Sequence, residues 1–259
     1  MNILEQLIGE TQDRKIISAH IGFFTTAVVS SDVNGAARCG LATTVKDGGC
    51  DGPVQRAGSL SGTPVRELAS LALSGKGPEV SLGMAAINSA LPPLDYEMIN
   101  AEELIAEHGR GKNIAVIGHF PFTDRLKTLA KELWVFELAP KDKDDLPPER
   151  MAELLPRADA VAITALTLLN RTFEPILAQC GKNAYKVLLG PSTPLSATLF
   201  DYGIDVVAGT VVDDIPLLVR HLGEGANFRH LQGKKMVVIR KAQNNMPIKG
   251  KNEVFRYNI

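Results

Sequence analysis

The chain has 259 residues, of which 45% are apolar and 22% are charged, and its formal net charge is −1. This length and composition are typical of a folded protein with one large or two modest domains, and they exclude intrinsic disorder. The near-neutral charge gives no whole-protein attraction for nucleic acid, so no nucleic-acid partner is expected. The three cysteines, Cys39, Cys50 and Cys180, are odd in number and widely spaced, which indicates reduced thiols.

No apolar run approaches the roughly 18 residues needed to cross a membrane. The first residues, MNILEQLIGETQDRK, lack the basic-then-apolar order of a signal peptide. We therefore predict a soluble, cytoplasmic protein with no membrane partner. From Phe228 onward eight basic residues face one acidic residue, which predicts either an anion-binding segment or a solvated edge strand and terminus.

The first 90 or so residues contain strands followed by helices, without alternation. Two β-rich runs, 15–31 and 37–45, are joined by the hairpin signal Asn34-Gly35. A glycine-rich loop at 46–62 precedes two helical stretches, which lie at 63–74 and 79–91. This order predicts a small α+β domain, which we place at residues 1–100.

From Asn113 onward strands and helices alternate strictly. Five strand-like runs are each followed by a helical stretch, and they lie at 113–120, 134–140, 159–166, 185–190 and 204–212. A late strand is predicted at 235–241. Such alternation predicts an α/β domain at 101–259 with a Rossmann-like, doubly wound and mostly parallel sheet. Thr63, Thr123 or Asp124, and Asp213 precede helical stretches and are predicted as N-caps.

In a doubly wound sheet, ligands bind outside the carboxyl ends of the strands. The sequence GPSTP follows the fourth strand, and Thr193 is placed there as N-cap of a helix with Pro194 at its first position. Ser192 and the helix N-terminus would then face an anion, whereas capping alone is the favoured interpretation of Thr193. After the third strand, either Asn170 or Thr172 is expected to cap the next helix and to leave the other free for a ligand.

Two further strand ends carry candidate catalytic or metal-binding residues. Glu137 follows the second strand, 19 residues beyond Gly118, which is the spacing of the ribose-binding acid in dinucleotide folds. The required G-x-G-x-x-G is absent and Phe120 and Phe122 crowd the loop, so ordinary NAD or FAD binding is disfavoured. His119, at the end of the first strand, is a candidate metal ligand or proton carrier.

Cys50, in the glycine-rich loop, is a further candidate metal ligand, or else an incidental thiol. Cys39 and Cys180 are expected to be small core residues. No nucleophile elbow, zincin motif or Walker loop is present, so the residues identify no reaction.

The runs ADAVAITALTLLNRTFEPIL and LLGPSTPLSATLFDYGIDVVAGTVVDD resemble the Rossmann-like domain of the putative heavy-metal chelation family. IGFFTTAVVSS, GSLSGTPVRELASLALS and SLGMAAINSAL resemble the enolase N-terminal-like domain that precedes it. The resemblance implies a ligand or metal site between the two domains, for a heavy metal or a metal-bearing cofactor. The residues that match its cleft motifs are Asn88, His119, Glu137, Thr164, Asn170, Thr172, Ser192 and Thr193.

The chain departs from the family where a glycine-containing TGT…NGT pattern is usual, because it has Thr164-Ala165-Leu166-Thr167 and Asn170-Arg171-Thr172. Arg171 is thereby brought near the crevice, as a candidate anion clamp.

Three functions are compatible with these residues. The first is a metal- or metallo-cofactor-binding protein whose interdomain cleft is covered by the glycine-rich loop. The second is an enzyme or sensor for a small anionic metabolite or nucleotide-like ligand at the strand ends. The third is a non-catalytic interaction protein. A homo-oligomer is expected on general grounds alone.

Overall fold

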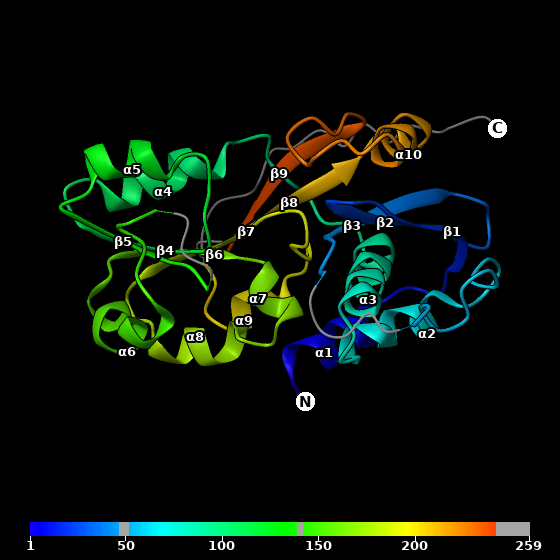
Figure 1. Ribbon diagram of the computed structural model, residues 1–259, viewed down its shortest axis with the longest axis horizontal. Coiled ribbons are helices and arrows are strands. Elements are labelled where there is room, and N and C mark those ends of the chain that lie inside the picture. The colour runs from blue at the N-terminus through cyan, green and yellow to red at the C-terminus, as the bar shows by residue number, and fades with distance from the viewer. Residues whose placement is uncertain (47–51, 139–141, 242–259) are drawn as a thin grey trace.

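The computed structural model describes residues 1–46, 52–138 and 142–241, and their strands form two sheets (Figure 1). The first sheet is antiparallel, in the order β1-β2-β3, with strands Lys15–Ile21, Thr25–Ser31 and Ala37–Thr43. The second has the order β5-β4-β6-β7-β8-β9. Its strands in chain order are Asn113–Ile117, Glu132–Phe136, Ala160–Thr164, Tyr185–Leu189, Val206–Val212 and Lys234–Arg240. The predicted fold class, an α+β part followed by a Rossmann-like sheet, is confirmed.

The three-stranded sheet is covered on both faces. Helix α3, Gly77–Ala90, packs on one face, and helix α10, Ile215–Gly223, packs on the other (Figure 1). Leu218 and Leu222 of α10 form an apolar cluster with Ala27 and Leu41 of the sheet. Strand β2 consequently buries six of its seven residues. The predicted hairpin at Asn34-Gly35 is confirmed, whereas the run predicted at 15–31 is two strands.

The six-stranded sheet is parallel from β5 to β8, and only β9 is antiparallel. Its order is that of the flavodoxin-like doubly wound sheet, which reverses between β4 and β6. One face packs against α4, Ala101–Gly109, and α5, Thr123–Leu129 (Figure 1). The other face is covered by short helices: α6 Met151–Leu154, α7 Leu166–Leu169, α8 Phe173–Gln179 and α9 Thr198–Asp201. The 3₁₀ turns η2, Pro148–Arg150, and η3, Leu155–Arg157, flank α6.

Both outer strands of this sheet carry an additional backbone bridge. Leu146 pairs with Phe136 of β5, and Glu97 pairs with Val238 of β9. The Glu97 carboxylate also accepts hydrogen bonds from Arg240, at 2.5 and 2.8 Å. The segment that joins the two sheets therefore passes along the β9 edge.

The two halves of the chain share one apolar core. A single cluster of buried residues contains Leu7, Val28 and Met84 from the first half together with Phe136 and Leu188 from the second. The remaining helices of the first half also contribute buried residues to this cluster: α1 Ile3–Glu10, α2 Val65–Ala69 and the 3₁₀ turn η1 Ser70–Leu73. The division of the chain into domains at residue 100 stays a prediction. Within the described ranges, no helix is both long and apolar enough to cross a membrane.

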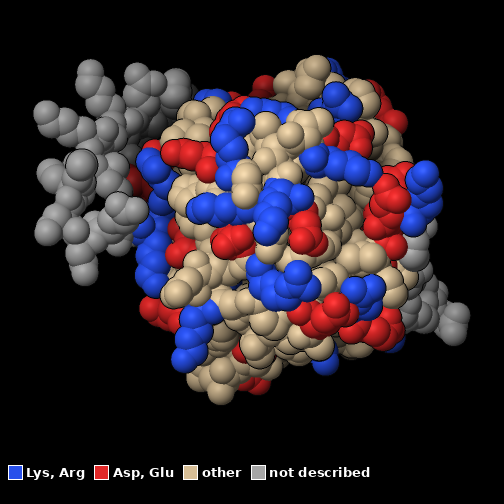
Figure 2. Space-filling view, turned by 90° about the vertical axis from the view of Figure 1, so that its left-hand side faces the viewer, with Lys and Arg blue, Asp and Glu red and all other residues tan. Residues whose placement is uncertain are grey.

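Surface charges at the β5 end of the molecule are mixed in sign. Figure 2 shows Lys and Arg side chains interspersed with Asp and Glu over this face. Arg125 contacts the carboxylates of Glu102 and Glu103 at 2.7 and 2.8 Å, and Lys127 contacts Asp144 at 2.7 Å. This face therefore does not present a patch of a single sign.

The predicted N-caps are largely wrong. The hydroxyl of Thr63 donates to the Leu60 carbonyl, and that of Thr123 donates to the Phe120 carbonyl, both at 2.7 Å. Neither hydroxyl accepts a helix N–H, because each is used in the turn that precedes the helix. Helix α10 is capped by Asp214, not Asp213, through a 2.9 Å bond from the Leu217 N–H.

We expect the substitution Gly40→Ala to destabilise the fold. A Cβ at Gly40 would lie 2.2 Å from the Ala85 carbonyl oxygen and 2.2 Å from the Ser89 nitrogen, both in the backbone of α3. Because α3 would have to move off the sheet, the free energy of unfolding should fall by about 1–3 kcal/mol or more in urea denaturation. Gly9→Ala is the matched control, since nothing lies within 4 Å of its Cβ and α1 should be slightly stabilised. Equal effects of the two substitutions would contradict this account.

Candidate metal site at the carboxyl edge

The strand order places β4 and β6 on either side of the switch point, where doubly wound sheets bind ligands. Gly118 follows β4 with φ +96°, and a Cβ there would lie 3.0 Å from Cγ2 of Thr164 at the end of β6. Only a glycine combines this φ with this close approach. The Thr164 hydroxyl accepts a 3.3 Å hydrogen bond from the Leu166 N–H, so it is used locally. His119 follows Gly118 in the chain, directly after the end of β4.

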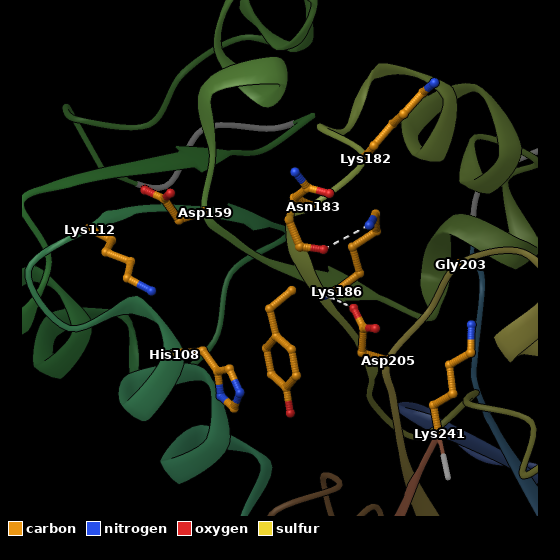
Figure 3. Close-up of a pocket in the computed structure, with 11 residues that line it drawn as sticks. His108, Lys112, Asp159, Lys182, Asn183, Lys186, Gly203, Asp205 and Lys241 are labelled. Carbon is orange, nitrogen blue, oxygen red and sulfur yellow. Dashed lines mark hydrogen bonds between the residues drawn. The ribbon is translucent and has the colours of Figure 1, made fainter. Parts of the chain in front are cut away.

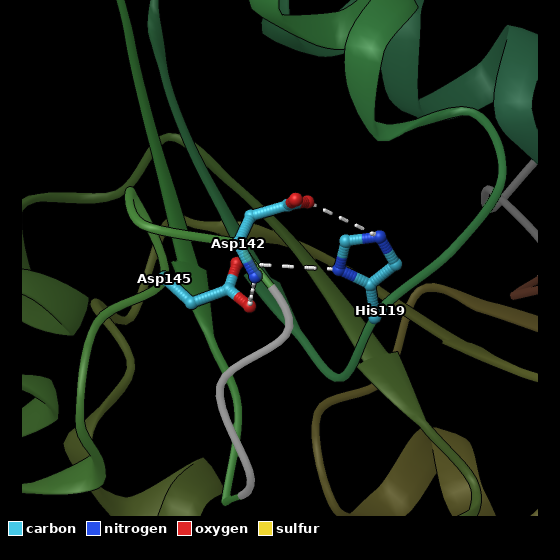
Figure 4. Close-up of side chains that lie close together, drawn as sticks. All are labelled: His119, Asp142 and Asp145. Atoms are coloured by element: carbon cyan, nitrogen blue, oxygen red, sulfur yellow. Dashed lines mark hydrogen bonds and ion pairs between the residues drawn. The ribbon is translucent and has the colours of Figure 1, made fainter.

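Three side chains meet here, as Figure 4 shows: His119, Asp142 and Asp145. Nε2 of His119 lies 3.7 Å from Oδ2 of Asp142, and Nδ1 lies 4.0 Å from Oδ1 of Asp145. One ligand atom from each residue can be chosen so that all three lie within 4.8 Å of one another. The side chain of Asp145 is 3% exposed, whereas that of Asp142 is 68% exposed. The group thus has one fixed and one solvent-facing carboxylate.

Residues 142–146, which follow β5 in the chain, are held in place by local hydrogen bonds. The Asp142 N–H donates to Oδ2 of Asp145 at 3.0 Å, and the Asp145 N–H donates to the Asp142 carbonyl at 3.1 Å. The Leu146 N–H then donates to the Val135 carbonyl at 2.7 Å, which ties this turn to β5. Because β5 is the neighbour of β4, the loops that follow the two strands meet.

His119 has one nitrogen that the described part of the chain leaves unsatisfied. Its Nδ1 is buried and has no hydrogen-bond partner there. A buried polar atom without a partner costs about 1–3 kcal/mol, so it requires an explanation. A cation held between this nitrogen and the two carboxylates would supply the missing interaction.

The other two candidate metal ligands do not join this group. Glu137 follows β5 directly, as predicted. Its N–H donates to the Leu146 carbonyl, and its Oε1 accepts a hydrogen bond from the Leu138 N–H at 3.0 Å. A catalytic or metal-binding role for Glu137 stays a prediction. Cys50 lies outside the described residues.

Three other predicted ligand contacts lie where the two halves of the chain meet, and not beside His119: Asn88, Ser192 and Thr193. The Ser192 hydroxyl, fully buried, accepts a 2.8 Å hydrogen bond from the Thr43 N–H at the end of β3. Nδ2 of Asn88 donates to the carbonyls of Leu41 and Ser192, at 2.8 and 3.2 Å. Oδ1 of Asn88 and Oγ1 of Thr193 are buried without a partner among the described residues. Ser192 and Asn88 therefore join the halves, and the role of all three residues as ligand contacts stays a prediction.

The prediction that Thr193 caps a helix is wrong. Helix α9 begins only at Thr198, whose N–H donates to the Ser196 hydroxyl at 3.1 Å. The hydroxyls of Ser196 and Thr198 both donate to the carboxylate of Glu10 in α1. With four residues, α9 has little dipole to offer an anion near Ser192.

Asn170, Arg171 and Thr172 form a compact turn before α8. Oδ1 of Asn170 accepts from both the N–H and the hydroxyl of Thr172, at 3.2 and 2.7 Å. One of these two side chains was predicted to be free for a ligand, whereas they bond to each other. Arg171 has φ +61°, a region unfavourable for a residue with a Cβ. Its guanidinium donates to the carbonyls of Leu73 and Ser74 in the first half, and it lines a cavity of about 390 Å³. Its role as an anion clamp stays a prediction.

Sequence reasoning identified His119 but not its two carboxylate neighbours. The available signal was the acidic run KDKDD, which follows the second predicted strand. Since the carboxyl ends of adjacent parallel strands share one edge, this run could have been placed beside His119 once β4 and β5 were taken as neighbours.

Comparison with known proteins supports the resemblance. Residues 100–241 match the DUF364 family model and residues 4–91 match the DUF4213 model, and both models are described as "Putative heavy-metal chelation". The chain belongs to this family.

Solved structures of two DUF364 family proteins of unknown function share the fold. The proteins from Desulfitobacterium hafniense and Pyrococcus horikoshii are 24% and 26% identical to this chain, each with a TM-score of 0.76. Each alignment covers 92% of this chain, and they cover 97% and 98% of the two relatives. An uncharacterized protein of Methanocaldococcus jannaschii is 32% identical over 152 residues, which span 56% of this chain and 59% of that protein.

Two neighbouring hydroxyls should differ in their effect on stability. Ser192→Ala leaves the Thr43 N–H without its buried acceptor, so the free energy of unfolding should fall by about 1–3 kcal/mol. Thr193→Val removes a buried hydroxyl that has no partner in the described part, so stability should be unchanged or raised. Thermal and urea denaturation measure both, and a larger loss for Thr193→Val would show that its hydroxyl has a partner.

Proposed function

We propose that this protein binds one divalent transition-metal ion through His119, Asp142 and Asp145. The observation that carries the proposal is the buried, unsatisfied Nδ1 of His119 beside two carboxylates at the switch point of the sheet. The description of the family supports metal binding in general terms. The ligand set and the place in the fold are our assignment.

The separations between the three groups are compatible with a metal after small side-chain movements. Ligand atoms about 2.1 Å from a tetrahedral zinc ion lie about 3.4 Å apart. A metal ion binds only one ring nitrogen of His119, and with one ligand atom taken from each residue the three atoms lie within 4.8 Å of one another, which is longer than this spacing. From Nδ1, the nearest carboxylate oxygen of Asp145 lies at 4.0 Å. Asp142 is exposed and can turn inward, whereas Asp145 is held by its backbone contacts.

The chemistry of the ligands favours borderline cations. One imidazole and two carboxylates suit Zn²⁺, Co²⁺, Ni²⁺ or Fe²⁺, whereas thiolates select softer ions. Burial raises the pKa of Cys39 to about 12 and that of Cys180 to about 11. Both therefore stay protonated at neutral pH, although only the thiolate is a metal ligand. The two described cysteines thus do not add soft ligands.

The site is suited to a metal that is exchanged rather than retained. Three protein ligands leave at least one coordination position of the ion open, and Asp142 borders solvent. A small chelating molecule could occupy the open position, so the cargo can be a free ion or a metal chelate. No reaction is assigned to the site.

The direct test is titration of metal-free protein with Zn²⁺, Co²⁺ and Ni²⁺ by calorimetry. We expect one ion per chain, and at least tenfold weaker binding, about 1.4 kcal/mol, for His119→Ala and for Asp145→Asn. Because Co²⁺ absorption reports the ligands directly, its visible spectrum should lose intensity in both variants. Elemental analysis of protein purified without chelators should give a matching stoichiometry.

Asp144→Asn is the matched control. It removes the same charge from the same acidic run, but Asp144 pairs with Lys127 at 2.7 Å and is not one of the three ligands. Its metal affinity should stay within about twofold of the wild type. Equal losses for Asp144→Asn and Asp145→Asn would reduce the effect to general electrostatic attraction and refute the site.

A further inference from the structure

A second feature lies at the opposite, amino edge of the six-stranded sheet. A cavity of about 400 Å³ opens where β4, β6, β7 and β8 begin (Figure 3). Six charged residues line it: Lys112, Asp159, Lys182, Lys186, Asp205 and Lys241. Ligand-binding cavities typically have volumes of about 300–1,000 Å³, so this one can hold a small molecule.

Among the described residues, the lysines of this cavity form no ion pair. Four of them line it against two aspartates, and none takes part in the ion pairs found among the described residues. Both aspartates are used by the backbone: Oδ2 of Asp159 accepts from the Asn113 N–H at 3.0 Å, and Oδ2 of Asp205 accepts from the Lys186 N–H at 2.8 Å. The cavity therefore has a formal excess of two positive charges.

Lys186 is the buried lysine of the cavity. Only 7% of this residue is exposed, and its Nζ donates one hydrogen bond, to the Ala184 carbonyl at 2.7 Å. An ammonium group has three donors, so two are available to a further acceptor. Burying a charge without a counter-ion is unfavourable, and such groups are normally paired. An anion in the cavity would provide both the counter-ion and the acceptors.

One wall of the cavity is aromatic. The rings of His108 and Tyr185 stack with centroids 3.5 Å apart and planes 4° from parallel. Nδ1 of His108 lies 2.9 Å from the Leu104 carbonyl, which can only accept, so Nδ1 carries the proton. Burial, with nearby Asp205, raises the pKa of Tyr185 to about 12, so its hydroxyl keeps its proton at neutral pH. The wall therefore offers a neutral tyrosine hydroxyl beside the lysines.

We propose that this cavity is a second binding site, for a small phosphate-bearing anion. Lysine binds phosphate as a point charge, and the cavity is lined by Lys112 before β4 and by Lys182 and Lys186 at the start of β7. The site is separate from the metal cluster, since β4 begins beside Lys112 and ends before His119.

The test is calorimetric titration of the whole chain with inorganic phosphate and with inorganic pyrophosphate, at constant ionic strength. We expect saturable binding of one pyrophosphate per chain. Its Kd should rise at least tenfold in the double variant Lys112→Gln/Lys182→Gln, whose exposed side chains can be changed without disturbing the core. The absence of saturable binding to the wild type would overturn the proposal.

Lys15→Gln/Lys76→Gln is the matched control, because it removes two exposed lysines from the other half of the molecule. It should bind pyrophosphate with the affinity of the wild type. A loss of affinity equal to that of Lys112→Gln/Lys182→Gln would show general charge attraction and overturn the proposal.

Lys186→Met provides a second readout. Without anion it should melt at or above the wild-type temperature, because a buried charge has been removed, and the rise in melting temperature produced by pyrophosphate should disappear. A rise equal to that of the wild type would place the anion elsewhere and overturn the proposal.

Discussion

The arrangement of this molecule depends on the burial of both faces of its three-stranded sheet. Strand β2 exposes almost none of its side chains, yet the first half of the chain supplies only α3 to cover one face. The other face is covered by α10, about 200 residues further along the chain, through Leu218 and Leu222. Because this contact fixes the two halves against each other, it also brings the end of β3 to the loop after β7. The hydrogen bond from Thr43 to Ser192 and the contacts of Asn88 follow from that placement.

Much of the architecture could be predicted from the sequence, because apolar periodicity and the alternation of strands and helices are local signals. The hairpin at Asn34-Gly35 and the five parallel strands follow from them. Helix starts were less predictable, since a Thr before a helix can bond backward to a carbonyl as easily as it can cap the helix, as Thr63 and Thr123 do. The helix expected from Pro194 shrinks to four residues because the preceding segment packs against α1 through Glu10. That contact joins residues far apart in the chain and leaves no local pattern.

The candidate site was predictable only in part, and for the same physical reason. A residue type at a strand end indicates which edge of the sheet it occupies, and this was enough to single out His119. Its partners depend on which strands are neighbours, and the order β5-β4-β6 is set by packing. The GPSTP segment shows the opposite case: its side chains were placed at an open crevice, but Ser192 and Thr193 are buried between the halves. The sheet itself separates the proposed metal site at one edge from the basic cavity at the other.

The bridges on the two outer strands have a consequence for the behaviour of the protein in concentrated solution. An uncovered outer strand presents a row of unpaired backbone groups, and a second molecule can add its own strand there. Leu146 occupies part of this row on β5, and Glu97 occupies part of it on β9, where its carboxylate is fixed by Arg240. Both rims of the large sheet are thus partly closed by the chain's own connecting segments, which opposes the growth of continuous intermolecular sheets and hence aggregation.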